Sequence, residues 1–331
     1  MPDITLTLAI NDYDHVRDLF SGRVKPEGIA LNCLQLPVEE IFFRFAQRQE
    51  WEVSEMSMGM YSSAVSRGDA PWVGIPVFPS RVFRQSAFFV RADGKVKKPE
   101  DLLGRKLGMP QWSQTATIYA RGWLQHQVGI PLSKIQWVQS GVNDPGRPEP
   151  SRINLPDGVT IAYDTKRSLT QLLLDGDIDC ILSAHPPHEF EHGDPRIVRL
   201  VQDWRSVEEA YFKDTGIFPI MHTIAIRRDA FEANRWIARN LYVAFDEAKR
   251  RSVARLKEIT ASQIALPWGE SMIAELTAKM YPGHDYWPYG IEANRVTIDA
   301  FLQYCFEQGV CAKRLAPEEL YPKEGQFTLR V

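Results

Sequence analysis

Two arginines, Arg81 and Arg84, follow an apolar strand pattern that runs from Trp72 to Phe78. A guanidinium group matches a carboxylate as a two-pronged donor, so these arginines are the best candidates for holding an anionic ligand. Ligands of open α/β sheets bind beyond the carboxyl ends of the strands, which is where this segment lies. Ser80 belongs to the same strand end and is assigned as a further ligand contact. The alternative is that one arginine only pairs with an acid of its own domain.

A second anion site is indicated at Ser113, Gln114 and Thr115, which open a long helical pattern after a strand. Free backbone N–H groups and the helix dipole favour a negative charge at such a place. Ser113 also suits a plain helix cap, and both roles use the same geometry. Trp112 and Phe83 are candidates for sandwiching an aromatic ring, with ordinary packing as the alternative for both.

Proton transfer is assigned to His222, His185 and Asp14, because each is predicted to lie at or near the end of a strand. Histidine exchanges protons near neutral pH. His222 lies in the apolar pattern Ile217–Ile226, so a packed core residue is the alternative there. For Asp14, as for Asp12, a turn or cap aspartate is equally compatible with the pattern.

The segment His188-Glu189-Phe190-Glu191-His192 has the H-E-x-x-H spacing of zinc proteases. That motif binds zinc when a helix places both histidines on one face. Gly193-Asp194-Pro195 follows at once, so the helix is predicted to last about one turn, and a metalloprotease is not expected. No cofactor is predicted, although a divalent metal held by His185 and His188 is kept as an alternative.

The 331 residues are 44% hydrophobic and 24% charged, as in soluble globular proteins of two domains. A formal net charge of −3 gives no reason to expect a nucleic-acid or membrane-surface partner. None of the four cysteines forms a C-x-x-C pair, and Cys33 and Cys180 lie inside apolar runs, so buried free thiols are expected. No export-signal pattern precedes the first strand, Ile4–Ile10, so a cytoplasmic location is expected. A homo-oligomer is compatible with these features.

Strand and helix patterns alternate along most of the chain, as in parallel sheets joined by crossover helices. They indicate one lobe that is begun, left near Arg84–Ser86, and completed after a return near Gly216–Pro219. The predicted lobes are residues 1–85 plus 218–331, and residues 86–217, with the ligand cleft between them. This order of elements resembles the type II periplasmic-binding-protein fold.

Two segments carry a more specific resemblance. They are Ile75-Pro76-Val77-Phe78-Pro79-Ser80-Arg81-Val82-Phe83-Arg84-Gln85-Ser86 and Thr215-Gly216-Ile217-Phe218-Pro219-Ile220-Met221-His222-Thr223. Asp12-Tyr13-Asp14, Gly22-Arg23-Val24 and Trp287-Pro288-Tyr289-Gly290 fit the same pattern. Through these segments, nearly the whole chain resembles the 4,5-dihydroxyphthalate decarboxylase family.

The resemblance implies that 4,5-dihydroxyphthalate, or a close hydroxylated aromatic dicarboxylate, loses one carboxylate as carbon dioxide and becomes protocatechuate during the catabolism of aromatic acids. Each ring hydroxyl is para to one carboxylate, so its deprotonation moves electron density onto the carbon that bears the carboxylate. Protonation of that carbon then precedes loss of carbon dioxide. Such a site needs cations, a base for the phenol and an acid for the carbon. His185 is expected at the ring hydroxyls or as an alternative acid.

Two other kinds of function use the same fold. One is a solute-binding receptor without catalysis. The other is a different small-molecule enzyme, resembling the pyrimidine-precursor synthases of thiamine biosynthesis or the dihydroxynaphthoate-forming enzyme of menaquinone synthesis. The lack of an export-signal pattern and the histidines and acids at the strand ends favour the decarboxylase.

Overall fold

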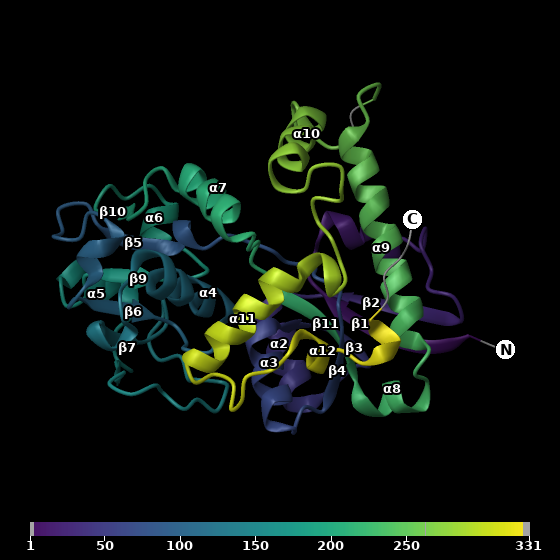
Figure 1. Cartoon of the computed structure of the whole chain (residues 1–331), viewed down its shortest axis with the longest axis horizontal. Helices are drawn as coiled ribbons and strands as arrows, with labels where there is room; N and C mark the ends of the chain where they lie inside the picture. The colour runs from purple at the N-terminus through teal and green to yellow at the C-terminus, as the bar shows by residue number, and fades with distance from the viewer. Residues whose placement is uncertain (1–2, 262, 327–331) are drawn as a thin grey trace.

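The computed structural model describes residues 3–261 and 263–326. Strands and helices alternate along these residues and build two sheets that lie side by side, so the expected α/β class is confirmed (Figure 1). We call the first sheet with its helices the first lobe, and the second sheet with its helices the second lobe.

The first sheet contains five strands of the described chain, in the order β2-β1-β3-β11-β4. Their bounds are Ile29–Gln35 for β2, Ile4–Ile10 for β1, Val53–Ser57 for β3, His222–Arg227 for β11 and Trp72–Ile75 for β4. Strand β1 is parallel to β2 and β3, whereas β11 is antiparallel to β3 and β4. The central position of β11 means that this sheet is completed by a segment from late in the chain.

The second sheet contains six strands of the described chain, in the order β10-β5-β9-β6-β7-β8. Their bounds are Ile197–Arg199 for β10, Phe88–Arg91 for β5, Cys180–Leu182 for β9, Lys106–Met109 for β6, Gln136–Gln139 for β7 and Ile161–Tyr163 for β8. Strand β5 is antiparallel to β9 and β10, and the other pairs are parallel. The chain passes into the second sheet at β5 and returns to the first sheet at β11. Each of these two strands is antiparallel to its neighbours.

Where the chain returns to the first lobe, strand β11 begins five residues later than the pattern Ile217–Ile226 predicts. Pairing as β11 begins at His222, and Ile220 forms only an isolated bridge with Arg81. Pro219 has no N–H to donate, which limits ladder formation before this point. All strands of the second sheet lie between residues 88 and 199. The lobe boundaries at 85/86 and 217/218 stay a prediction.

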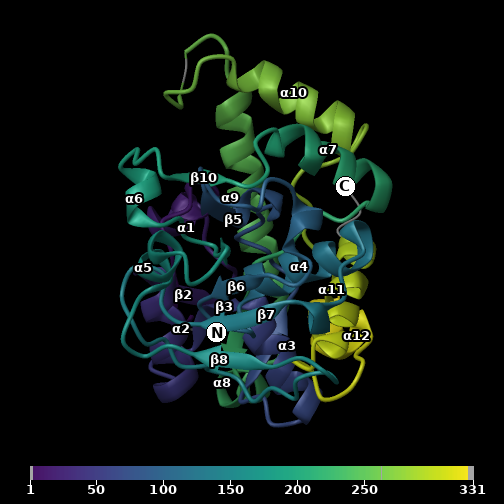
Figure 2. The same cartoon turned by 90° about the vertical axis from the view of Figure 1, so that its left-hand side faces the viewer.

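Helices cover both sheets (Figure 2). Their bounds are Arg17–Phe20 for α1, Val38–Arg48 for α2, Met58–Arg67 for α3, Thr115–Trp123 for α4, Leu169–Asp175 for α5, His188–Glu191 for α6, Trp204–Thr215 for α7, Arg228–Ala233 for α8, Ile237–Lys257 for α9, Gly269–Met280 for α10, Arg295–Glu307 for α11 and Pro317–Leu320 for α12. Across the described residues, no helix is both long enough and apolar enough to cross a bilayer.

Helices α4 and α11 join the two lobes through close packing. The ring of Tyr119 in α4 stacks on Phe301 in α11, with ring centroids 4.7 Å apart. The buried Arg121 donates from Nε to Gln308 Oε1 over 2.8 Å. Gly122 allows the ring of Tyr304 to lie directly against the backbone of α4, because a glycine has no Cβ.

Gly122→Ala should destabilise the protein by about 1–3 kcal/mol, because overpacking a close contact forces the surroundings to shift. The added Cβ would lie 2.6 Å from Tyr304 Cε2. Urea unfolding followed by tryptophan fluorescence measures the change. In a Tyr304→Leu background the same substitution should cost less, since the ring is gone. Equal costs in both backgrounds would contradict this account of the interface.

Candidate active site

A cavity of about 370 Å³ lies between the two lobes at the ends of their strands. Residues of the first lobe that line it include Tyr13, Glu39 and His222, and residues of the second lobe include Arg147 and His185. Ligands of open α/β sheets bind at such strand ends, and clefts between lobes are a preferred place for small molecules.

A larger hollow of about 1140 Å³ lies elsewhere, between α9, α10 and residues 281–293. None of its lining residues belongs to a strand. Its buried cation, Lys249, is already paired with Asp246 at 3.1 Å and with Asp285. We therefore take the cavity between the lobes as the candidate active site.

The centre of the first-lobe wall is Glu55, a fully buried acid in β3. Its Oε1 contacts His222 Nδ1 at 2.6 Å and accepts a hydrogen bond of 2.6 Å from the Tyr13 hydroxyl. Its Oε2 accepts a hydrogen bond of 3.0 Å from the backbone N–H of Asn11. A carboxylate on Nδ1 holds the imidazole ring in place and leaves Nε2 for a ligand in the cavity. Sequence reasoning placed His222 in the cleft but missed Glu55.

Aromatic and hydroxyl groups complete this wall. The ring of Phe42 in α2 meets His222 edge-on, with centroids 4.9 Å apart. The Ser80 side chain hydrogen-bonds Tyr13, and Ser80 lines the cavity as expected. Burial and the nearby charge of Glu55 both raise the pKa of Tyr13, so its phenol stays protonated at neutral pH.

Arg84 brings positive charge to the cavity, as the sequence predicts. Its Nε approaches Met221 Sδ at 3.2 Å, and it forms no ion pair with the described acids. Burial lowers the pKa of Arg84 to about 10, while the charge of Glu208 acts in the opposite direction. A guanidinium without a carboxylate partner is ready to bind an anionic ligand.

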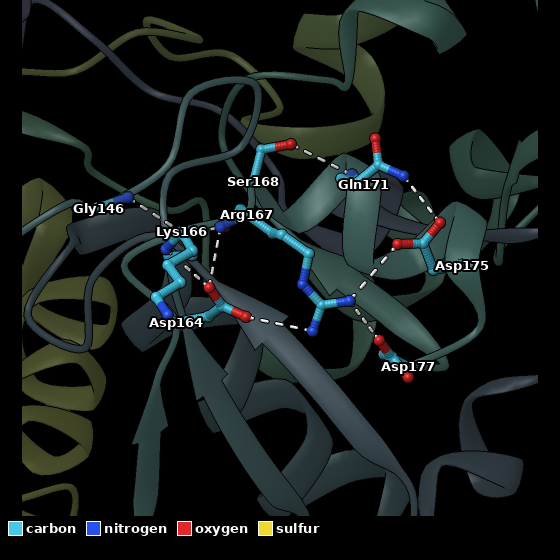
Figure 3. A network of polar contacts seen from close by, with 9 residues as sticks. Gly146, Asp164, Lys166, Arg167, Ser168, Gln171, Asp175 and Asp177 are labelled. Carbon is cyan, nitrogen blue, oxygen red and sulfur yellow. Dashed lines mark hydrogen bonds and ion pairs between the residues drawn. The ribbon is translucent and has the colours of Figure 1, made fainter.

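Arg147 is a second cation in the cavity, and sequence reasoning did not single it out. Its loop follows β7, where Gln139 Nε2 donates to the Arg147 carbonyl over 3.0 Å. Ser140 Oγ accepts from the N–H of Gly146 and donates to the carbonyl of Arg167. Figure 3 shows how Arg167 in turn spans three aspartates, Asp164, Asp175 and Asp177. This network anchors the loop that carries Arg147.

His185 reaches across the cavity to the first lobe. Its Nε2 lies 2.8 Å from Oε1 of Glu39, in the first turn of α2. The contact raises the pKa of His185 and lowers that of Glu39 to about 2. The pair therefore joins the two lobes at the cavity.

The predicted anion site at Ser113 holds a carboxylate of the protein itself. Glu149 accepts from the Trp112 N–H over 2.6 Å, from the Ser113 N–H over 3.3 Å, and from Ser113 Oγ. The groups expected to favour an anion are thus used internally.

Gln114 and Thr115 also line the cavity. Thr115 Oγ1 contacts Ser57 Oγ at 3.0 Å and accepts from the Gly59 N–H over 2.9 Å, both in the first lobe. The buried Oε1 of Gln114 has no hydrogen-bond partner among the described residues. Thr115 is thus a contact between lobes, while Gln114 forms part of the cavity wall.

Arg81 does not reach the cavity, which corrects its assignment as a carboxylate clamp. Its side chain is buried and donates to the carbonyls of Phe218 (2.8 Å) and Pro288 (3.3 Å). Its guanidinium lies 4.3 Å from the centre of the Phe218 ring. The bridge between Arg81 and Ile220 aligns this backbone with the returning chain and directs the side chain into the first lobe.

Asp14 and Trp112 also lie away from the cavity. Asp14 accepts from Ser252 Oγ over 2.5 Å and pairs with Arg17 at 3.0 Å, so it supports the contact with α9. Trp112 is fully buried under Arg121, whose guanidinium lies 3.8 Å from the ring centre. Neither position allows the predicted role as phenol base or ring sandwich.

No group of three or more His, Cys, Asp and Glu side chains is placed to hold a metal ion in residues 3–261 and 263–326. The H-E-x-x-H segment forms the one-turn helix α6 that its sequence predicts, and its two histidine rings are 6.3 Å apart. The alternative of a divalent metal held by His185 and His188 stays a prediction.

Glu55→Ala should cost about 1–3 kcal/mol of stability, because it leaves buried donors without an acceptor. Glu55→Gln keeps the shape and one acceptor, so it should cost less. Urea unfolding measures both values. Glu50→Ala is the control, since this surface acid of an Arg44 pair should leave the unfolding midpoint almost unchanged. A Glu55→Ala protein as stable as the wild type would contradict the buried network.

The chain has close relatives among characterised proteins, although no family model matches it. The 4,5-dihydroxyphthalate decarboxylase of Comamonas testosteroni is 34% identical over 322 residues, which is 97% of each chain. The protein of the same name from Pseudomonas putida is 31% identical over 216 residues, or 64% of this chain and 83% of that protein.

Solved structures agree on the fold. The periplasmic aliphatic sulphonate binding protein SsuA of Escherichia coli aligns with a TM-score of 0.54 at 13% identity, over 97% of this chain and 98% of that one. The desulfurization enzyme DSZB aligns with a TM-score of 0.53 at 13% identity, over 97% of each chain. The fold is that of the type II periplasmic-binding proteins. By its likeness to these two decarboxylases, which spans 97% of each chain for the Comamonas testosteroni protein, the chain belongs to the 4,5-dihydroxyphthalate decarboxylase family.

Proposed function

We propose that the protein removes one carboxylate from 4,5-dihydroxyphthalate, or from a closely related hydroxylated aromatic dicarboxylate, and releases protocatechuate and carbon dioxide. Membership of a carboxy-lyase family supports the reaction type. The observation that carries the proposal is the combination of two unpaired guanidinium groups and a carboxylate-backed histidine in one cavity.

Arg84 and Arg147 bind the two carboxylates of the substrate in this proposal. Both line the cavity, and neither is neutralised by an ion pair within the described residues. Binding a dianion between two guanidinium groups orients the ring and compensates the charge that the carboxylates lose when they leave water. Such a site should bind a dicarboxylate more tightly than a simple catechol.

His222 delivers the proton to the ring carbon. Glu55 holds the imidazole through Nδ1, so Nε2 is the nitrogen that meets the substrate. A general acid must lie within hydrogen-bond reach of the atom it protonates, and the cavity wall provides that place. When the carbon has accepted the proton, its bond to the carboxylate breaks, carbon dioxide leaves and the electron pair restores the aromatic ring.

The proposal includes no cofactor. The para hydroxyl, once deprotonated, becomes a carbonyl in the dienone intermediate and holds the electrons that a cofactor would otherwise accept. Turnover measured after exhaustive chelation tests this part, because a metal-dependent enzyme would lose activity. Cytoplasmic location and homo-oligomer formation stay predictions.

A solute receptor is the main alternative. A receptor needs fixed hydrogen bonds to its ligand, but it has no use for a histidine backed by a buried acid. The buried Glu55 beside His222 therefore favours catalysis. A different enzyme of this fold is the third possibility, and it would require a ligand without two carboxylates.

The purified protein should convert 4,5-dihydroxyphthalate to protocatechuate, with one carbon dioxide released for each product molecule. Chromatography of the aromatic acids and capture of the gas measure both products. Phthalate, which lacks the hydroxyls, should bind without turnover, because no phenol drives the reaction. Tight binding of 4,5-dihydroxyphthalate without turnover would indicate a receptor, and no binding at all would indicate another enzyme.

Arg84→Ala should raise KM for 4,5-dihydroxyphthalate about 10- to 100-fold, the usual value of one charged hydrogen bond. Arg84→Lys should show a smaller increase, because it keeps the charge without the fork. Arg91→Ala is the matched control, since this arginine pairs with Asp93 outside the cavity. Steady-state kinetics measure all three. An unchanged KM in Arg84→Ala would remove this arginine from the carboxylate site.

A further inference from the structure

A second pair of proton-transfer groups faces the cavity, apart from Glu55 and His222. Glu39 comes from the first lobe and His185 from the second, and both line the cavity. The carboxylate contacts Nε2 at 2.8 Å, so Nδ1 is the ring nitrogen left for a ligand. The side chains are 44% and 62% exposed, which means that a ligand in the cavity can reach the imidazole.

The reaction requires a base for the ring hydroxyl, and the other acids are not in position for it. Asp14 is held by Ser252 and Arg17 at the contact with α9. Glu55 lies behind His222 and Tyr13, which take up its Oε1. Among the described residues that line the cavity, Glu39 is the one acid.

We infer that the pair of Glu39 and His185 accepts the proton of the ring hydroxyl that is para to the departing carboxylate. This inference rests on the proposed decarboxylation and divides its proton transfers between the lobes. The O–H bond breaks and its proton moves to His185 Nδ1, while Glu39 stabilises the imidazolium that forms. The phenolate electrons move to the para carbon, which takes its proton from His222. After carbon dioxide has left, His185 returns its proton to the phenolate oxygen.

The base is shared between lobes. Glu39 lies in the first turn of α2, and His185 follows β9. If the lobes separate, the imidazole loses its carboxylate and becomes a weaker base. Proton abstraction is therefore coupled to closure around the substrate, which prevents premature formation of a reactive phenolate in open solvent.

The charges around His185 determine how the base responds to pH. Glu39 raises its pKa, while burial and the positive charges of Arg147 and Arg84 act to lower it. Asp144, His188 and Glu191 line the adjoining hollow that also contains His185. An imidazole must be neutral to accept a proton, so kcat/KM should fall as the pH drops through the raised pKa of His185. Glu39→Gln removes the largest raising influence, so the fall should move to lower pH.

The first test uses the product, protocatechuate, as a probe of the base. A catechol that loses a proton absorbs at longer wavelength, so a difference spectrum of the bound product reports deprotonation. The wild type should show this band near neutral pH, and Glu39→Gln and His185→Gln should lose it. Glu40→Gln is the matched control, because the neighbouring acid pairs with Arg44 outside the cavity and the band should persist.

The second test separates the two proton transfers. His185→Gln should lower kcat by about 100- to 10,000-fold, the usual contribution of a general base. Glu39→Gln should lower it less, since the imidazole remains. In D2O the wild type should exchange the product's ring hydrogen para to the 3-hydroxyl. His222→Gln should lose that exchange but keep the catecholate band.

Two results would overturn the inference while the proposed function stands. One is 4,5-dihydroxyphthalate turnover with an unshifted pH profile and an unchanged band in Glu39→Gln. The other is an equal loss of phthalate and protocatechuate binding in that variant without any change in kcat, which would make the pair a plain contact between lobes. Absence of turnover in the wild type would instead contradict the proposed function itself.

Discussion

A buried carboxylate without hydrogen-bond donors is unstable, and this constraint on Glu55 organises the candidate active site. The acid lies in β3, entirely out of solvent, and three donors from two other segments must surround it. The turn after β1 provides Asn11 and Tyr13, and the start of β11 provides His222. Because the charge needs all of these groups, the first and last parts of the first lobe are held together at the cavity.

The two lobes contribute different chemistry to the same cavity. The first lobe provides a rigid histidine that is fully supported from behind. The second lobe provides Arg147 and His185 on segments that follow strands. The carboxylate partner of His185, Glu39, comes from the first lobe on the opposite side of the cavity. The packing of α4 on α11 keeps the lobes joined at one place, so the groups at the cavity can meet in a defined geometry.

The order of strands and helices, and the strand ends that carry Ser80, Arg84 and His222, could be predicted because strand patterns and strand-end placement are local signals. The direction in which a side chain points, however, is not determined by the local sequence. Arg81 and Arg84 belong to one segment, yet the bridge to Ile220 directs Arg81 inward.

The missed residues, Glu55, Glu39 and Arg147, have little local signal. Glu55 appears as one charge within a strand, and Glu39 resembles an ordinary acid in the first turn of a helix. Only tertiary contacts show that each of these acids faces a histidine from a distant segment. The local pattern at Ser113 predicts an anion site, but it does not reveal that Glu149, 36 residues away in sequence, accepts from Ser113.

The position of β11 between β3 and β4 has a consequence for synthesis on the ribosome. The strands β1 to β4 emerge first, but β4 pairs with no strand of its sheet other than β11 within the described residues. The second sheet has all its strands by residue 199. The second lobe can therefore complete its sheet earlier, whereas the sheet of the first lobe lacks β11 between β3 and β4 until residues 222–227 have been synthesised. The pairing of β11 with β3 and β4 also brings His222 to Glu55, so the first-lobe wall of the cavity and the first sheet are completed in the same step.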